Sequence, residues 1–311
     1  MGPPALLSAK PIGCRPMISL EIPHPARVEC AHIMNTHEWT RSRPRKRRSG
    51  LAVAMVALAC GPWGCGPTKP GPTETLTLKS GIEMTFAYIP AGRFRMGSPA
   101  DEPGRGKDET PHEVTITKAF YLSATEVTQS QWQAVMDDNP SYLIGDDRPV
   151  EHISWTQAVE FCRRLSEQTG RACRLPTEAE WEYACRARGG GMFFFGNRAR
   201  RLRAFAWYQD SSGLAKTHAV GKKKPNPWGL YDTYGNVREW CADWYQPYPT
   251  ERARDPAGPD EGKRRVIRGG SWGYIAPFCR SARREAAPPG RRTHYVGLRV
   301  AMDRHVAMDA P

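Results

Sequence analysis

The sequence predicts an irregular α+β domain, and three observations lead to that class. Strand-like alternation is short and precedes residue 123, whereas three segments between residues 128 and 186 carry helix start signals. After residue 186 the chain is rich in Gly, Pro, Trp and Tyr, and no long periodic segment follows. The regular strand–helix alternation of a doubly wound sheet does not occur in the sequence. We therefore expect one domain of low regular secondary structure over residues 76 to 304.

The first expected elements are strands. Residues 83 to 90 alternate between apolar and polar side chains, and residues 92 to 97 follow them through a turn. Residues 112 to 117 and 120 to 122 are shorter candidates of the same kind. These four runs predict the strands of the N-terminal part of the domain.

Three helices are expected next, because three capping boxes precede apolar periodic segments. The boxes are Thr128 with Gln131, Ser154 with Gln157, and Thr177 with Glu180. Gly170 is expected to end the second helix. Cys162 and Cys185 fall on the apolar faces of the second and third helices, which favours small buried side chains over reactive thiols.

The net charge of +13 is concentrated near the N-terminus. The first fifty residues hold nine Lys/Arg and three Asp/Glu, and most of that excess lies in residues 41 to 48. A basic run of this kind is compatible with nucleic-acid binding. The apolar segment that follows it favours a different interpretation, so we expect no nucleic acid among the partners.

That apolar segment, residues 51 to 60, has the layout of a secretory signal after a basic stretch. It is too short for a transmembrane helix, which needs about 20 apolar residues. Ala59-Cys60 resembles a lipoprotein cleavage site, so Cys60 is the expected lipidated residue and Cys65 a second candidate. A plain cleaved signal and a buried apolar strand are the alternatives.

The remaining organisation follows from composition. Residues 1 to 60 form a leader with its signal segment, and Met34 is a candidate for the true start because it gives a basic region of ordinary length. Residues 61 to 75 are rich in Gly, Pro and Thr and predict a flexible tether. Residues 305 to 311 form a tail.

The cysteines predict no zinc site. The chain has nine of them, and none has the spacing of a zinc motif with another Cys or His. Five lie in the predicted domain, and their pairing is left open. These five are Cys162, Cys173, Cys185, Cys241 and Cys279.

Three motifs combine Gly, aromatic and polar residues in an order that periodicity does not explain: residues 174 to 183, 229 to 240 and 268 to 272. With residues 89 to 97 and 297 to 299, they resemble the formylglycine-generating-enzyme (sulfatase-modifying-factor) domain family in order and spacing. The resemblance implies a fold related to C-type lectins. It also implies oxidation of a sulfatase cysteine to formylglycine, with O2 and a copper ion held by two thiolates.

The chain departs from that family at the copper ligands. The two thiols of the motif lie three and eight residues beyond the serine that corresponds to Ser271, and these positions hold Tyr274 and Cys279. Ile275 replaces a histidine of many oxidases, and Arg238 replaces a tryptophan. A phenol with a pKa near 10 cannot replace a thiolate on Cu(I). Cys279 and Ser271 therefore mark a degenerate catalytic site, and we expect no copper.

Cys279 itself has two interpretations. It is either a buried structural cysteine or a lone reactive thiol whose pKa is lowered by the arginines that follow it.

The resemblance further implies a structural calcium site in residues 229 to 240. Its ligands would be the side chains of Asp232 and Glu239 and the carbonyls of Gly235 and Val237, a donor set that suits a hard cation. The alternative is that both acids only cap turns.

Two other groups have a structural and a functional interpretation. The lysines of residues 222 to 224 are expected in a solvated loop. Five aromatic residues are expected either in the core or in a stacking floor for a sugar or peptide: Trp207, Tyr208, Trp228, Trp244 and Tyr245.

The sequence thus predicts an exported, monomeric member of the family in the bacterial periplasm or at the cell surface, held to the membrane by a lipid anchor. It would lack sulfatase cysteine oxidase activity and act as a binding or accessory module for a protein or peptide, or for a glycan. The alternative is an oxidoreductase of the same family, formylglycine-generating or similar to the pyoverdine-maturation members, acting on a protein or peptide.

Overall fold

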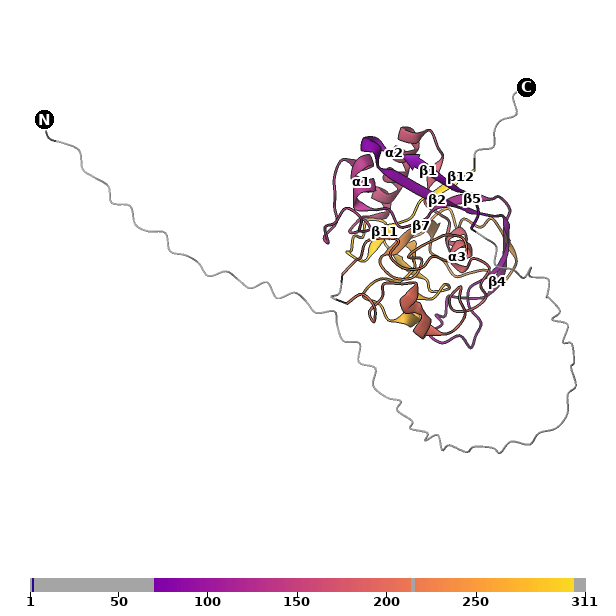
Figure 1. Ribbon diagram of the computed structural model, residues 1–311. Helices are drawn as coiled ribbons and strands as arrows, with labels where there is room; N and C mark the ends of the chain where they lie inside the picture. The colour runs from indigo at the N-terminus through magenta and orange to yellow at the C-terminus, as the bar shows by residue number, and fades with distance from the viewer. Residues whose placement is uncertain (1, 3–69, 214–215, 305–311) are drawn as a thin grey trace, which may run out of the picture. The chain divides into compact units, whose positions relative to one another are not determined.

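A computed structural model describes Gly2, residues 70 to 213 and residues 216 to 304 (Figure 1). The predicted signal segment, the lipidation candidates Cys60 and Cys65, and the tail after Arg304 lie outside these residues. Within the described part, no helix is long and apolar enough to cross a membrane.

The largest sheet brings together strands from both ends of the domain. Its spatial order is β1 (Thr73–Thr77), β2 (Glu83–Ile89), β5 (Phe120–Ser123), β12 (Ala301–Asp303) and β6 (Cys173–Arg174). All neighbouring pairs in it are antiparallel. Because β12 pairs with β5 and β6, the last strand of the domain closes onto elements from its first half.

Two smaller sheets complete the strand structure. One has the order β10 (Glu285–Ala287), β9 (Arg265–Arg268), β7 (Arg238–Trp244) and β11 (Val296–Leu298), with β11 parallel to β7. The other has the order β3 (Gly92–Met96), β4 (His112–Ile116) and β8 (Ala253–Arg254). The sequence predicted β2 to β5 to within one or two residues at their ends.

The three predicted helices begin at their predicted capping boxes. They are α1 (Gln129–Met136), α2 (Trp155–Thr169) and α3 (Glu178–Arg186), and both hydrogen bonds of each box are present. Gly170 ends α2 in the left-handed conformation, with φ of 68°. The only other described helices are short 3-10 turns: η1 (Lys79–Gly81), η2 (Ala199–Ala204) and η3 (Ala276–Cys279). The prediction of an irregular α+β domain is confirmed.

One boundary differs from the sequence prediction. Strand β1 begins at Thr73, inside the segment expected to be a flexible tether. Its Thr-Glu-Thr-Leu-Thr sequence alternates, buries Leu76 and pairs with β2 over its whole length. The Thr-rich composition that suggested a tether also suits a strand, because β-branched residues favour extended backbone.

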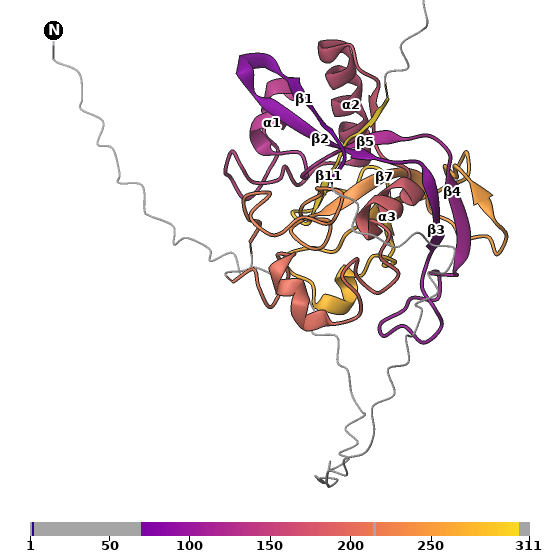
Figure 2. The same ribbon diagram turned by 45° about the vertical axis from the view of Figure 1, so that its right-hand side comes forward.

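Helix α3 lies at the centre of the domain and connects two of the sheets (Figure 2). It packs against β3 and β4 of one sheet and against β7 and β9 of another. Its residues Trp181, Tyr183 and Cys185 are buried, as is Cys162 of α2. All five cysteines of the described domain are buried and free, so the structural interpretation holds for Cys162 and Cys185.

Candidate functional site

The segment that corresponds to the oxidase motif is a tight turn after β9. Gly269 and Gly270 have φ of 101° and 74°, a region that favours glycine. A Cβ on Gly270 would lie 2.6 Å from Sγ of Cys279. Glycine is therefore required at this position, both for the backbone turn and for the close approach of η3.

Cys279 is fully buried at the end of η3. Burial raises the pKa of its thiol to about 12, and the backbone N–H of Ser271 offsets only part of that effect. Ser271 is also fully buried, and its hydroxyl has no partner among the described residues. The structure brings these two predicted residues together in the core, where a neutral thiol is favoured.

Tyr274 and Arg238, the two residues that depart from the oxidase pattern, belong to one cluster. The Tyr274 hydroxyl donates to Glu285 Oε2 at 3.2 Å, and Arg238 forms an ion pair with the same carboxylate. The Arg238 guanidinium carbon also lies 5.2 Å from the centre of the Tyr274 ring. Burial raises the Tyr274 pKa to about 12, so the phenol stays protonated. Both side chains are held by Glu285, which sequence reasoning missed.

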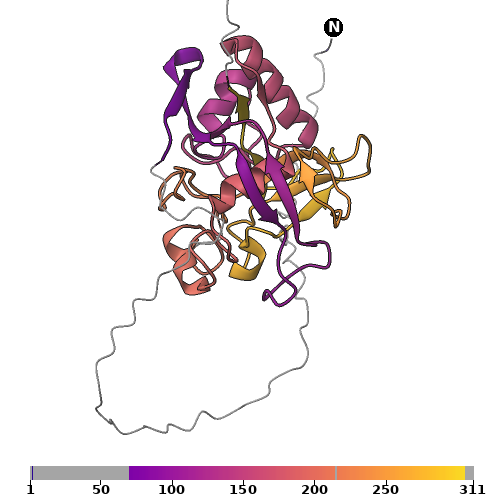
Figure 3. The ribbon, with the colours of Figure 1, turned by 90° about the vertical axis from the view of Figure 1, so that its right-hand side faces the viewer.

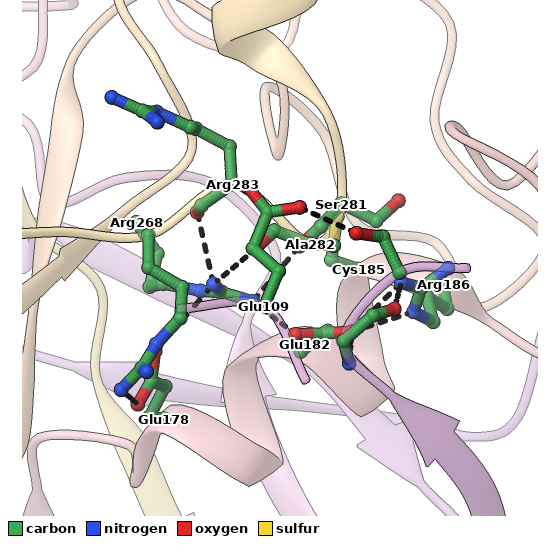
Figure 4. Close-up of polar contacts among 12 residues, drawn as sticks. Glu109, Glu178, Glu182, Cys185, Arg186, Arg268, Ser281, Ala282 and Arg283 are labelled. Atoms are coloured by element: carbon green, nitrogen blue, oxygen red, sulfur yellow. Dashed lines mark hydrogen bonds and ion pairs between the residues drawn. The ribbon is translucent and has the colours of Figure 1, made fainter. Parts of the chain in front are cut away.

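Arg268 fixes the chain that follows Cys279 (Figure 4). Its guanidinium donates to the carbonyls of three residues in a row, namely Ser281 at 2.8 Å, Ala282 at 3.1 Å and Arg283 at 2.9 Å. It also forms an ion pair with Glu182 of α3. The side chains of Arg268 and Glu182 are both fully buried, so the arrangement depends on these two charges staying paired.

A second buried ion pair holds the same segment on its other side. Arg280 donates to both oxygens of Glu109 at 2.7 Å and to Glu102 at 2.5 Å. Burial acts to raise the pKa of Glu109, but Arg280 and the Ser98 hydroxyl outweigh it and hold that pKa below its usual value. Arg280 therefore binds the acids of the loop that precedes β4, and it does not activate the Cys279 thiol.

The predicted calcium ligands Asp232 and Glu239 are both buried, and Glu239 already has strong partners. Arg299 donates to its two oxygens at 2.9 and 3.0 Å, and the Trp181 indole donates at 2.6 Å. Asp232 accepts a hydrogen bond from the Gly221 N–H at 2.7 Å, and its other oxygen has no partner among the described residues. The unpartnered Asp232 oxygen is available to a cation. Glu239 would have to give up its ion pair with Arg299 before it could bind the same cation.

Glu126 joins this pair of acids and was missed from the sequence. It accepts hydrogen bonds from the Asn236 side chain at 2.7 Å and the Val237 N–H at 2.9 Å. Its burial, together with the charges of Asp232 and Glu239, raises its pKa well above the usual value. Burial likewise raises the pKa of Asp232 to about 6. No group of three or more His, Cys, Asp or Glu side chains in the described chain is arranged as a metal site, so calcium stays a prediction.

Several large apolar side chains of the described domain are exposed. They include Tyr142 at 77%, Ile144 at 68%, Ile275 at 42% and Phe278 at 39%. Aromatic contacts form two groups: His294 contacts Tyr142, Trp272 and Tyr295, and Phe278 packs edge-on to Tyr274. The Arg238 guanidinium lies over one ring of each group, Tyr295 and Tyr274. We call these residues the aromatic face. Exposed apolar side chains that lie together are typical of contact surfaces, whereas single ones are common on protein surfaces.

The five aromatic residues singled out from the sequence do not form a single floor. Tyr208 and Trp228 are buried core residues. The other three are half-buried, and each lies under a cation: Trp207 under Lys223, Trp244 under Arg265, and Tyr245 under Arg264 and Arg284.

A small pocket of about 160 Å³ opens elsewhere, beside α3 and the residues after β7. Its walls include Asp243, Tyr248, His112 and Trp244, which is one of the five aromatic candidates, and none of the predicted catalytic or metal residues. Asp243 is buried and accepts the Glu178 N–H at 2.7 Å. Its burial, with the neighbouring Glu178, raises its pKa to about 7.

Comparison with known proteins identifies a family over the whole described domain. The family model of the sulfatase-modifying factor enzyme 1-like domain matches residues 76 to 304. Among relatives, the formylglycine-generating enzyme of Bos taurus is 34% identical over 69% of this chain and 74% of its own length. The chaperone protein LppX of Paenibacillus barcinonensis is 31% identical over 51% of this chain and 71% of its own.

Solved structures give the same result. The Treponema denticola variable protein 1 is 34% identical, with a TM-score of 0.69 over 75% of this chain and 99% of that protein. PvdO from Pseudomonas aeruginosa is 31% identical, with a TM-score of 0.66 over 76% of this chain and all of PvdO. The chain is thus similar over three quarters of its length to two solved structures, a variable protein and PvdO.

Proposed function

The chain belongs to the sulfatase-modifying factor enzyme 1-like family, and from that premise we propose that it is an exported binding or accessory module without sulfatase cysteine oxidase activity. One observation carries the proposal: the position of the first copper-ligand thiol holds Tyr274, and Glu285 and Arg238 hold that side chain in place. The remaining thiol, Cys279, is fully buried.

The chemistry of the oxidases explains why this change matters. Cu(I) prefers thiolate sulfur, and two such ligands leave the ion open to a third thiol and to O2. A protonated phenol offers a hard oxygen in a cluster that already satisfies it, and burial keeps the Cys279 pKa near 12. The arrangement therefore favours a neutral, packed core at the place where the oxidases hold a metal.

The aromatic face supports a binding role. Interfaces concentrate their affinity in large aromatic side chains, and this surface presents Tyr142, Phe278 and a stack that includes Tyr295. The expected partner is a protein or peptide, with a glycan as the alternative. One relative is named a chaperone protein, which supports a role in handling other proteins.

The location at the cell envelope rests on the N-terminal sequence. Residues 41 to 48 are basic, residues 51 to 60 are apolar, and Cys60 follows a small residue as in lipoprotein signals. Mass spectrometry of the protein isolated from cells tests this part. We expect a mature chain that begins at a lipid-modified Cys60, and a chain that retains residues before Leu51 would contradict export.

Copper affinity tests the catalytic part directly. We expect the purified protein to lose a Cu(I) competition against a colorimetric chelator, and the Tyr274→Cys variant to bind Cu(I) measurably tighter. Tyr274→Phe is the matched control, because it also removes the hydrogen bond to Glu285 but adds no thiol. Tight Cu(I) binding by the unchanged protein would favour the oxidoreductase alternative.

A further inference from the structure

Two basic segments that are separate in the sequence lie side by side in the fold. Residues 198 to 224 hold eight Lys/Arg and one acid, and seven of the eight cations lie at residues 198 to 203 and 222 to 224. The Lys224 N–H donates to the Ala204 carbonyl at 3.0 Å, and the Lys223 ammonium donates to the Arg203 carbonyl at 2.9 Å. The sequence alone predicted only a solvated lysine loop, whereas these contacts join it to η2.

The cations of this surface are free to meet an outside partner. Six of them are exposed: Arg198, Arg200, Arg201, Arg203, Lys222 and Lys224. None of the eight takes part in an ion pair within the described part of the chain. Partial burial lowers the pKa of Lys223, and repulsion from Arg203 lowers it further. An anionic partner would relieve that repulsion.

Half-buried aromatic rings lie between these cations. Arg201 lies 5.4 Å from the centre of the Phe195 ring, and Lys223 lies 3.8 Å from that of Trp207. Phe205 stacks on Phe195 at 4.7 Å. Cations interleaved with amphipathic aromatic side chains are the composition of surfaces that bind at the headgroup level of a membrane. We call these two segments with their rings the basic face.

The start of the folded chain lies close to the basic face. A Cβ on Gly229 would meet the Pro70 side chain at 3.9 Å, and the Gly229 N–H donates to the Asn226 carbonyl at 3.0 Å, two residues after Lys224. In Figure 3 the indigo start of the fold and η2 lie on the same side of the domain. The chain from Cys60 to Pro70 spans at most about 35 Å even when fully extended. A lipid on Cys60 would thus hold this side of the domain near the membrane.

We propose that the basic face docks on the anionic phospholipid headgroups of the membrane to which the N-terminus is anchored. The inference rests on the envelope location of the proposed function. Charge complementarity, the interleaved aromatic rings and the entry of the chain at Pro70 all point to this occupant. Docking would fix the orientation of the domain relative to the membrane.

Vesicle binding tests the docking. The protein is purified with Cys60→Ser and Cys65→Ser, so that no acyl chain contributes, and is mixed with vesicles of phosphatidylethanolamine and phosphatidylglycerol or of phosphatidylcholine alone. The test variant replaces four cations of the basic face with serine: Arg200, Arg201, Lys222 and Lys224. The matched control replaces four exposed cations on other elements: Lys79, Arg93, Arg95 and Lys118.

We expect binding to the anionic vesicles only, weakened on the order of a thousandfold in the test variant, since each cation contributes about 1 kcal/mol, and little changed in the control. Raising the salt to about 0.5 M should release the protein. Equal weakening in both variants, equal binding to neutral vesicles, or release by millimolar inorganic phosphate would overturn the inference. So would binding to nucleic acid, but not to vesicles, through the same four cations. None of these outcomes depends on where the mature chain begins. Mass spectrometry of the mature N-terminus tests the envelope location separately.

Discussion

Single side chains distinguish the site of this chain from the oxidase pattern. Tyr274 and Arg238 each differ from the oxidase pattern, and the structure shows that both bind Glu285. A return to oxidase turnover, beyond tighter Cu(I) binding, would therefore need more than one substitution, because Tyr274→Cys leaves Arg238 paired with Glu285 beside the new thiol. The same reasoning applies to Ile275, which is exposed where many oxidases have a histidine.

Asp243 gives a prediction about pH. Its pKa is about 7 in the folded protein against an ordinary value of 3.8, and burial is the main cause. Between those values the folded state keeps a proton that the unfolded state has lost, so this group makes stability fall as pH rises from about 4 to 7. Asp243→Asn should match the parent near pH 4 and exceed its free energy of unfolding at pH 8, on the order of a few kcal/mol.

Urea unfolding of both proteins at several pH values measures that difference. Other titrating groups are common to the two chains and cancel in the comparison. A difference that does not change with pH would show that Asp243 has an ordinary pKa in the folded protein.

At the level of elements, one arginine joins β9, α3 and the segment after η3. Arg268→Met should lower the free energy of unfolding by about 3–5 kcal/mol, because it removes one of the two buried arginines that pair with Glu182, leaving only Arg186, and it frees three carbonyls. Arg163→Met is the matched control: its side chain is 54% exposed and pairs with Glu160 and Glu167 on the surface of α2. We expect a loss below about 1 kcal/mol there. Equal losses in urea unfolding would contradict the assigned role of Arg268.

Local signals in the sequence were sufficient for the helices and the early strands. A capping box involves residues three apart, so Ser154 and Gln157 could be recognised without any knowledge of the fold. The Arg268–Glu182 and Arg280–Glu109 pairs join residues 86 and 171 positions apart, and no local pattern encodes such contacts. Likewise, sequence spacing identified Tyr274 as a replacement but could not show that Glu285 holds it.

On the scale of the whole domain, a calcium ion bound by Asp232 and Glu239 would link the segment around the start of β7 to elements far apart in the chain. We expect calcium to raise the melting temperature and EDTA to lower it, with a stabilisation of about 2.7 kcal/mol when calcium is a hundredfold above its dissociation constant. Asp232→Asn should abolish the calcium effect. In EDTA the same variant should be at least as stable as the parent, because it removes a buried carboxylate with an unpartnered oxygen. A melting temperature that changes with neither calcium nor EDTA would contradict the calcium site.

The absence of cysteine oxidase activity is the claim on which the proposed function depends most. The decisive measurement is mass spectrometry of a cysteine-containing sulfatase-type peptide incubated with the unmodified protein, Cu(I), reductant and O2. A formylglycine-generating enzyme in a parallel reaction verifies the conditions. We predict no aldehyde product, because one buried thiol and a protonated phenol cannot hold Cu(I) open to substrate. Conversion of the peptide cysteine to an aldehyde by the unmodified protein would contradict the account.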